Sequence, residues 1–115
     1  MELRLLVLRS NDPEKTASFY NLLGFSFEYH QHGNGPFHYA AKMEKAILEI
    51  YPLTKSQTET DKNIRLGFAI DHFESTIDKL KLHNIAFALE PTDTDFGFLA
   101  IIVDPDQRKV ELYKK

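Results

Sequence analysis

A four-residue motif occurs twice, once in each half of the chain. Residues 48–51 read Leu-Glu-Ile-Tyr and residues 110–113 read Val-Glu-Leu-Tyr. In each copy a glutamate stands between two aliphatic residues, and a tyrosine follows. Because the side chains of a strand alternate between two faces, the aliphatic residues share one face, and the glutamate and tyrosine share the other. The chain of 115 residues is therefore predicted to contain two copies of one structural module.

The first half predicts a strand, a helix and three further strands. Residues 2–9 form a short apolar run that is typical of a buried strand. Asp12 and Pro13 predict the start of a helix, with Asp12 as its cap, and Gly24 predicts its end. The three strands that follow are predicted over residues 25–30, 39–43 and 46–51.

The second half predicts the same order of elements. A capping box formed by Asp71 and Glu74 predicts the start of its helix, and residues 91–97 are predicted to form a loop. The strands are predicted over residues 64–70, 85–89, 98–103 and 109–113. The expected fold is α+β, with two βαβββ modules whose curved, mainly antiparallel sheets carry a helix on the convex side. We expect one domain, 1–115, made of module 1 (about 1–53), a linker (about 54–61) and module 2 (about 62–115).

Composition excludes several kinds of site and partner. The chain has no cysteine, so disulfides, thiolate nucleophiles and cysteine zinc sites are excluded. Its net charge of −3 argues against a nucleic-acid partner. No apolar run has the ~18–20 residues that a membrane span needs. The N-terminus lacks the layout of a secretory leader, so we expect a cytoplasmic protein.

Several short motifs stand in a fixed order along the chain. They are Leu8-Arg9-Ser10-Asn11-Asp12, Phe19-Tyr20, Leu23-Gly24-Phe25, Gly67-Phe68-Ala69-Ile70-Asp71 and Asp104-Pro105-Asp106 followed by Lys109-Val110-Glu111-Leu112. Together they resemble the vicinal oxygen chelate superfamily of glyoxalases, bleomycin-resistance proteins and extradiol dioxygenases. The last motif has Gln107 where the superfamily usually has glycine. The resemblance implies a glyoxalase-like fold and a homodimer.

The resemblance also implies where a metal would bind in this chain. The four ligand positions of the superfamily fall on Leu5, Glu49, Arg65 and Glu111. Leucine has no donor atom, and arginine stays protonated in proteins, so neither residue ligates a metal. We therefore expect no metal and no cofactor at these positions.

The two repeated glutamates are the first candidate functional residues. We expect Glu49 and Glu111 to line a shared cavity together with Tyr51 and Tyr113, although surface carboxylates on strands are also common. Two neighbouring carboxylates raise the pKa of one of them unless a cation compensates. Arg65 is predicted on the same face, where its guanidinium would bridge the carboxylates or bind an anionic ligand.

Three histidines near a glycine-rich turn form the second candidate group. A two-residue loop at Asn34-Gly35 would pair His30 with Tyr39, whereas a three-residue loop over residues 33–35 would pair His30 with His38. We favour the second register because it puts the more apolar set, Tyr39, Ala41 and Met43, against the helix. His30, His38 and Glu28 then line the concave face. We expect polar wall residues here; metal binding that includes His32 is the alternative, and His38 is the best candidate general base.

These observations predict a protein that binds a small molecule in a concave crevice without the superfamily's metal. The expected ligand-binding residues are Arg65, Tyr51, Tyr113, His30 and Leu5. The alternative is a metal-dependent lyase, isomerase or dioxygenase of the same superfamily. Its expected catalytic residues are Glu111 as base, with Glu49 and His38 in support. A third reading is a structural or regulatory module that pairs with a second copy of the chain.

The four superfamily positions give a direct test. We expect Zn, Ni, Mn or Fe to bind through Glu49 and Glu111 only after Arg65→His and Leu5→His are combined, because catalytic sites typically need about three protein ligands. The measurement is the metal content of protein purified without chelator. About one metal per wild-type chain, held by these two glutamates, would contradict the expectation.

Overall fold

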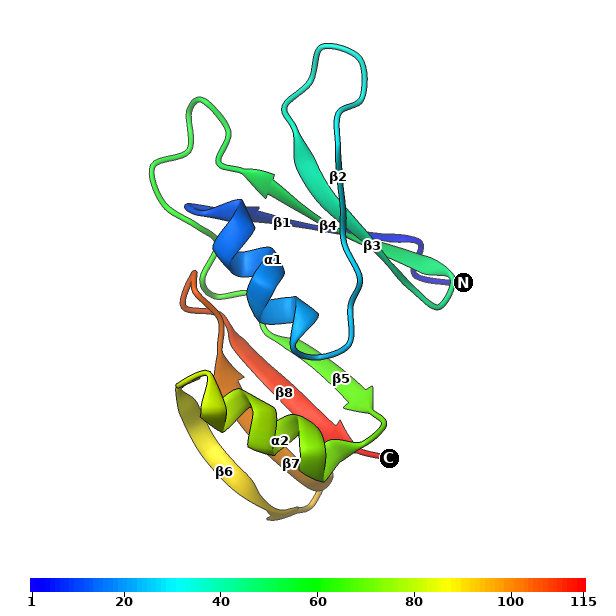
Figure 1. Cartoon of the computed structure of the whole chain (residues 1–115), viewed down its shortest axis with the longest axis vertical. Coiled ribbons are helices and arrows are strands. Elements are labelled where there is room, and N and C mark those ends of the chain that lie inside the picture. Colours follow the sequence, from blue (N-terminus) through cyan, green and yellow to red (C-terminus); the bar gives the residue numbers. More distant parts are fainter. The chain divides into compact units, whose positions relative to one another are not determined.

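The chain folds into two compact units, which a computed structural model describes over all residues, 1–115 (Figure 1). Unit 1, Met1–Asp61, contains β1 (Leu5–Ser10), α1 (Pro13–Asn21), β2 (Glu28–His30), β3 (His38–Met43) and β4 (Ala46–Pro52). Unit 2, Lys62–Lys115, contains β5 (Leu66–Ile70), α2 (Phe73–Leu82), β6 (Phe87–Thr94), β7 (Gly97–Val103) and β8 (Lys109–Lys114). The predicted α+β fold with two βαβββ modules is confirmed.

Both units build their sheets in the same way. The strand orders are β1-β4-β3-β2 and β5-β8-β7-β6. The first and last strands of each module pair in parallel, and all other pairs are antiparallel. This topology places the strand that carries each Glu-x-Tyr repeat in the interior of its sheet.

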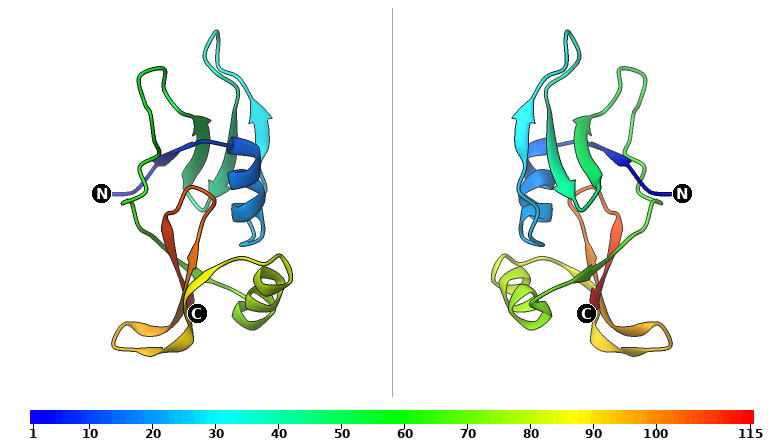
Figure 2. Two further views of the ribbon diagram at one scale, coloured as in Figure 1. Left: turned by 90° about the vertical axis from the view of Figure 1, so that its left-hand side faces the viewer. Right: turned by 90° about the vertical axis from the view of Figure 1, so that its right-hand side faces the viewer.

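The helix of each module covers the aliphatic face of its sheet (Figure 2). In β4, Leu48 and Ile50 are fully buried, and in β8 Val110 and Leu112 are fully buried. Burying a side chain of this size contributes about 1.5–3 kcal/mol. The intervening glutamates point to the opposite face, as predicted. In Figure 2 the β6–β7 hairpin curls away from α2, so the open face of this sheet is concave.

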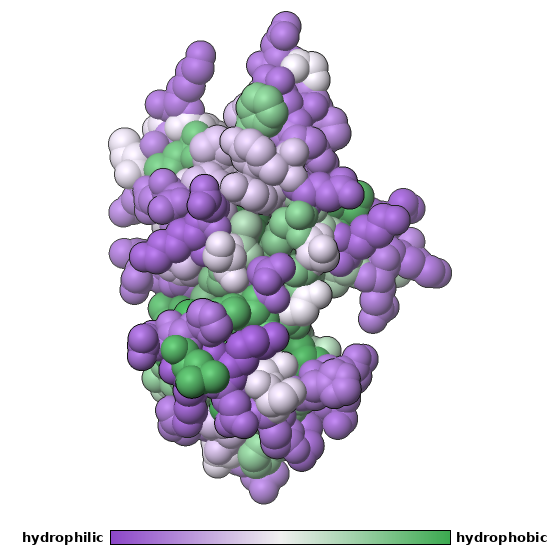
Figure 3. Space-filling view, viewed as in Figure 1, coloured by the Kyte–Doolittle hydropathy of each residue, from purple (hydrophilic) through white to green (hydrophobic).

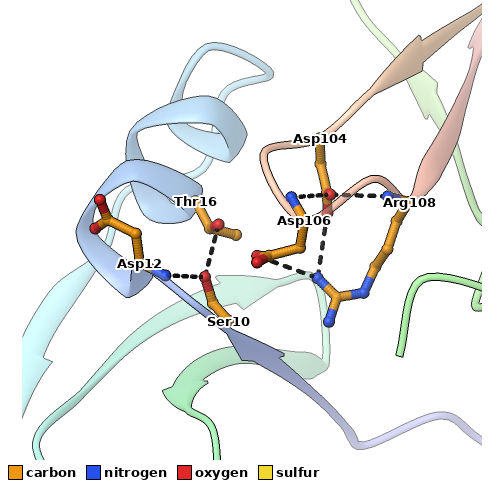
Figure 4. Close-up of polar contacts among 6 residues, drawn as sticks. All are labelled: Ser10, Asp12, Thr16, Asp104, Asp106 and Arg108. Carbon is orange, nitrogen blue, oxygen red and sulfur yellow. Dashed lines mark hydrogen bonds and ion pairs between the residues drawn. The ribbon is translucent and has the colours of Figure 1, made fainter. Parts of the chain in front are cut away.

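Helix α1 begins as the sequence predicts. The Asp12 carboxylate accepts a hydrogen bond from the Lys15 backbone N–H at 3.2 Å, and Pro13 is the first helical residue. The buried hydroxyls of Ser10 and Thr16 lie 2.9 Å apart and join β1 to the first turn of the helix (Figure 4).

The capping box predicted for α2 is wrong. The residue at the helix cap is His72, which has a left-handed conformation with φ of 53° and makes no side-chain capping bond. The two carboxylates bind lysines of the C-terminal segment instead: Asp71 lies 3.5 Å from Lys115, and Glu74 lies 2.8 Å from Lys114. These lysines reach the helix because β8 runs parallel to β5, and this pairing places Lys114 beside Ile70, shortly before the helix begins.

The loop predicted over residues 91–97 is also wrong, because β6 continues to Thr94 and only a tight turn precedes Gly97. Pro91 has no backbone N–H to donate to a neighbouring strand. It is tolerated because β6 is an edge strand, whose pairing with β7 is interrupted by register shifts between Phe87 and Thr92.

The turn between β7 and β8 is built on a buried charge cluster (Figure 4). One oxygen of Asp104 accepts hydrogen bonds from the backbone N–H groups of Asp106 and Arg108, at 2.8 and 3.0 Å. Its other oxygen lies 3.3 Å from the guanidinium of Arg108, which is fully buried. This geometry gives Gln107 a positive φ of 71°.

Neither helix is long and apolar enough to cross a membrane. Seen from the side of Figure 1, polar and charged side chains cover most of the visible surface, and apolar side chains form separate patches (Figure 3).

The strained backbone of Gln107 predicts that Gln107→Gly stabilises the protein. A non-glycine residue in the left-handed region costs about 1–2 kcal/mol, and the greater freedom of glycine in the unfolded chain offsets about 0.5–1 kcal/mol of the gain. We expect the free energy of unfolding in urea to rise by about 0.5–1 kcal/mol. Gln107→Ala keeps the strain and is the matched control. A glycine variant no more stable than the alanine variant would contradict this account.

Candidate functional site

A row of aromatic and cationic side chains crosses the open face of the unit 1 sheet. Arg9 faces Tyr51, His38 faces His30, and the register of β3 and β4 places His38 beside Tyr51. The rings of His38 and Tyr51 stack at 4.1 Å with an angle of 9° between their planes. The Arg9 guanidinium lies 4.7 Å from the centre of the Tyr51 ring. Tyr51 therefore holds His38 in place through its ring face.

The neighbouring row brings a carboxylate to His38. Glu49 stands between Val7 and Ala40 in this row. Because the Ala40 side chain is only a methyl group, the Glu49 carboxylate has room to reach His38. Glu49 Oε2 lies 3.3 Å from His38 Nε2. His38 is 1% exposed and the Glu49 side chain 13% exposed, so this pair is largely shielded from solvent.

The predicted histidine register is confirmed, since His30 pairs with His38 across β2 and β3. The ring of His32 completes a group of three, whose centres lie 4.5–5.0 Å apart. One donor atom from each of these histidines and one oxygen of Glu49 all lie within 4.8 Å of one another. The sequence placed the histidines together, but only the fold added Glu49 to them.

The open face of unit 2 carries a different arrangement. Arg65 Nη1 lies 3.3 Å from Glu111 Oε2, and the Tyr113 hydroxyl donates a hydrogen bond to Glu111 Oε1 at 2.5 Å. This bond and the partial burial of the ring raise the pKa of Tyr113, because both favour the protonated phenol. Gly67 lies opposite Glu111, and a Cβ there would stand 3.4 Å from the Tyr113 ring.

Arg65 also lines a shallow hollow of about 270 Å³ in unit 2. Its lining residues are Lys62, Asn63, Ile64, Arg65, Gln107 and Lys109. Three of these six residues are cationic, so the hollow suits an anionic group of a ligand. The sequence analysis missed Lys62 and Lys109. Strand alternation could have identified Lys109 as a site residue, because it lies two residues before Glu111 and therefore on the same face of the strand.

The sequence analysis expected a bridge from Arg65 to both glutamates. The structure places Arg65 on Glu111, and its contact with Glu49 stays a prediction. Leu5 lies opposite Ile47, and the residue beside Glu49 in β1 is Val7. Neither aliphatic side chain offers a metal ligand, and Arg65 brings a positive charge to Glu111. These donors do not fit the metal that the resemblance implies.

Comparison with known proteins identifies relatives of the whole chain. A sequence model of the family described as "Glyoxalase/Bleomycin resistance protein/Dioxygenase superfamily" matches residues 3–112. No curated protein matches the chain significantly.

Solved structures share the fold over nearly the full length. TnmS3, an antibiotic binding protein from Streptomyces sp. CB03234, has a TM-score of 0.79 at 20% identity, over 99% of this chain and 95% of its own. Oxidase ChaP-H2 has a TM-score of 0.79 at 13% identity, over 100% of this chain and 94% of its own. A glyoxalase/bleomycin resistance protein from Streptomyces sp. CB03234 has a TM-score of 0.74 at 21% identity, over 97% and 99%.

The contact between Glu111 and Tyr113 predicts how the phenol titrates. We expect Glu111→Gln to lower the pKa of Tyr113, because the charge that disfavours the phenolate is removed. In the wild type, the raised pKa contributes stability below pH about 10, which is lost as the pH rises through the folded-state pKa. The measurement is an NMR titration of the tyrosine rings, with Tyr113→Phe for assignment. Glu90→Gln, which alters an exposed carboxylate paired with Lys81, is the control. An unchanged titration in Glu111→Gln would refute this cause.

Proposed function

The chain belongs to the glyoxalase/bleomycin resistance protein/dioxygenase superfamily, and we propose that it binds a small molecule against the open faces of its sheets without the superfamily's metal. The observation that carries this proposal is the ion pair between Arg65 and Glu111 at 3.3 Å. It puts a fixed positive charge beside one of the two carboxylates that a metal of the superfamily would need. The description of TnmS3 as an antibiotic binding protein supports the same class of function.

The ligand that this proposal favours is an anionic aromatic molecule. The hollow at Arg65, Lys62 and Lys109 supplies positive charge for a carboxylate or phosphate group. The ring of Tyr113, whose hydroxyl shares Glu111 with Arg65, lies on the same face of the sheet and offers apolar contact. Such a combination of a few charges with aromatic walls is typical of small-molecule sites.

The contacts of the Glu111 carboxylate favour a binding function over a catalytic one. Each of its oxygens already has a partner, Tyr113 on one and Arg65 on the other. A general base must direct a carboxylate oxygen at the proton that it removes. The partners of Glu111 compete with a substrate for those oxygens, so the carboxylate acts as a structural anchor for Arg65.

A metal-dependent lyase, isomerase or dioxygenase remains the second candidate function. It is supported by the contact of His38 with Glu49, which is a common arrangement for orienting a general base, and by the fold shared with oxidase ChaP-H2. In this alternative Glu111 and Glu49 act with His38. Chemical conversion of a bound ligand would distinguish it from simple binding.

We propose a homodimer as the functional form. Leu5 and Ile47 are neighbours on the open face of unit 1, and they are 53% and 41% exposed. A second copy of the chain would shield this apolar pair from water. Light scattering of the purified protein measures the mass directly, and a monomer at micromolar concentration would contradict the dimer.

The binding proposal is tested with a panel of anionic and neutral aromatic compounds, screened by thermal shift and measured by calorimetry. We expect anionic members to bind, and we expect Arg65→Gln to weaken them about 10- to 100-fold, because a charge-assisted hydrogen bond is worth about 1.5–3 kcal/mol. Arg4→Gln is the control, since Arg4 is an exposed arginine paired with Glu2. Equal binding of anionic and neutral members, unchanged in Arg65→Gln, would contradict the proposal.

A further inference from the structure

Three histidines and one glutamate converge on the open face of unit 1. They come from four consecutive parts of the chain: His30 ends β2, His32 follows it, His38 begins β3, and Glu49 lies in β4. One donor atom of each lies within 4.8 Å of the donor atoms of the other three. We propose that these four residues form a binding site for a divalent transition-metal ion, with Zn²⁺ as the best match.

The strongest sign of a cation-binding site is a pair of buried nitrogens. His30 Nε2 and His38 Nε2 are both shielded from solvent and make no hydrogen bond. A buried polar atom without a partner costs about 1–3 kcal/mol. Two such atoms in one cluster, beside a carboxylate, indicate that the site is built for a group outside the polypeptide.

The contacts of His38 show which of its two ring nitrogens carries the proton and which carries the lone pair. His38 Nδ1 lies 3.2 Å from the carbonyl oxygen of Pro36, which only accepts hydrogen bonds, so Nδ1 carries the proton. In the neutral ring, Nε2 then points a lone pair at Glu49 Oε2, 3.3 Å away. Two electron pairs that face each other at this distance repel unless a cation lies between them. A backbone carbonyl on the outer nitrogen is also the usual support of a metal-bound histidine.

A second proton on His38 is the competing explanation. It would satisfy His38 Nε2 through an ion pair with Glu49, but it would leave His30 Nε2 without a partner. A metal ion satisfies both nitrogens and the carboxylate at once. The structure therefore favours the metal.

The donor set selects the kind of metal. Imidazole nitrogens with one carboxylate suit Zn²⁺, Ni²⁺ and Cu²⁺, whereas Ca²⁺ and Mg²⁺ prefer oxygen ligands only. Four protein ligands fill a tetrahedral shell, as structural zinc sites do. A metal ion bound here would hold the β2–β3 hairpin against β4. This link matters because β2 itself has only three residues.

Closing the site requires a small movement. Zinc bonds of ~2.0–2.1 Å place tetrahedral donors about 3.3 Å apart, so the widest spacing has to contract by about 1.5 Å. His32 is exposed, and Gly33 and Gly35 follow it in the turn. His32 is therefore the ligand that is free to move inward. This site shares Glu49 alone with the superfamily's metal positions and does not depend on the proposed ligand.

The test uses tag-free, chelator-treated protein titrated with Zn²⁺ against a chromophoric competitor, and with Co²⁺ for its visible spectrum. We expect one Zn²⁺ per chain, a dissociation constant below about 1 μM, a higher melting temperature and tetrahedral Co²⁺ bands. His30→Gln and Glu49→Gln should weaken binding at least about 100-fold, and His32→Gln at least about 10-fold. His32→Gln alters an exposed side chain, so its effect is not a failure to fold.

Two controls separate this site from other metal binding. His72→Gln with His83→Gln removes the only other histidines and should leave the affinity unchanged. Glu111→Gln removes a superfamily position and should also change nothing. Absence of stoichiometric Zn²⁺ binding would overturn the proposal. So would an affinity that His30→Gln or His32→Gln leaves unchanged, or binding that is lost in Glu111→Gln.

Discussion

The alternation of side chains along β4 and β8 is the constraint on which the rest of the structure depends. Each strand lies in the interior of its sheet, and the aliphatic residues of its helix-covered face, Leu48 and Ile50 in β4 and Val110 and Leu112 in β8, are fully buried. A shift of register by one residue would exchange the two faces and bury a glutamate in each core. The hydrophobic gain on one face therefore fixes the position of Glu49 and Glu111 on the other.

The two modules bring different partners to their repeated glutamate. In unit 1, Glu49 lies against a histidine ring that is held by Tyr51. In unit 2, Glu111 lies against Arg65, a permanent cation. An imidazole exposes a lone pair when it is neutral, whereas a guanidinium never does. The same scaffold thus offers a set of metal donors in one unit and an anion-binding group in the other.

The local patterns predicted most of the fold. The order of helices and strands along the chain, the cap of α1 at Asp12 and the pairing of His30 with His38 all follow from short-range rules of alternation, capping and loop length. The errors lie where a distant segment intervenes. Asp71 and Glu74 do not cap α2, because they pair with lysines at and just beyond the end of β8. Pro91 lies within a strand because that strand is at an edge of its sheet. Neither neighbour is visible in the local sequence.

The sequence by itself determined which face each candidate residue occupies, because that choice follows from the pleat and from the hydrophobic pattern. It identified Glu49, Glu111, Arg65 and the three histidines as chemically interesting residues. Apart from the pairing of His30 with His38, only the tertiary structure decided which of them meet. The distance from His38 to Glu49 depends on the pairing of β3 with β4 and on the small side chain of Ala40, and the contact of Arg65 with Glu111 depends on the parallel pairing of β5 with β8. Contacts across a sheet join residues far apart in the chain, and no local pattern encodes their distance.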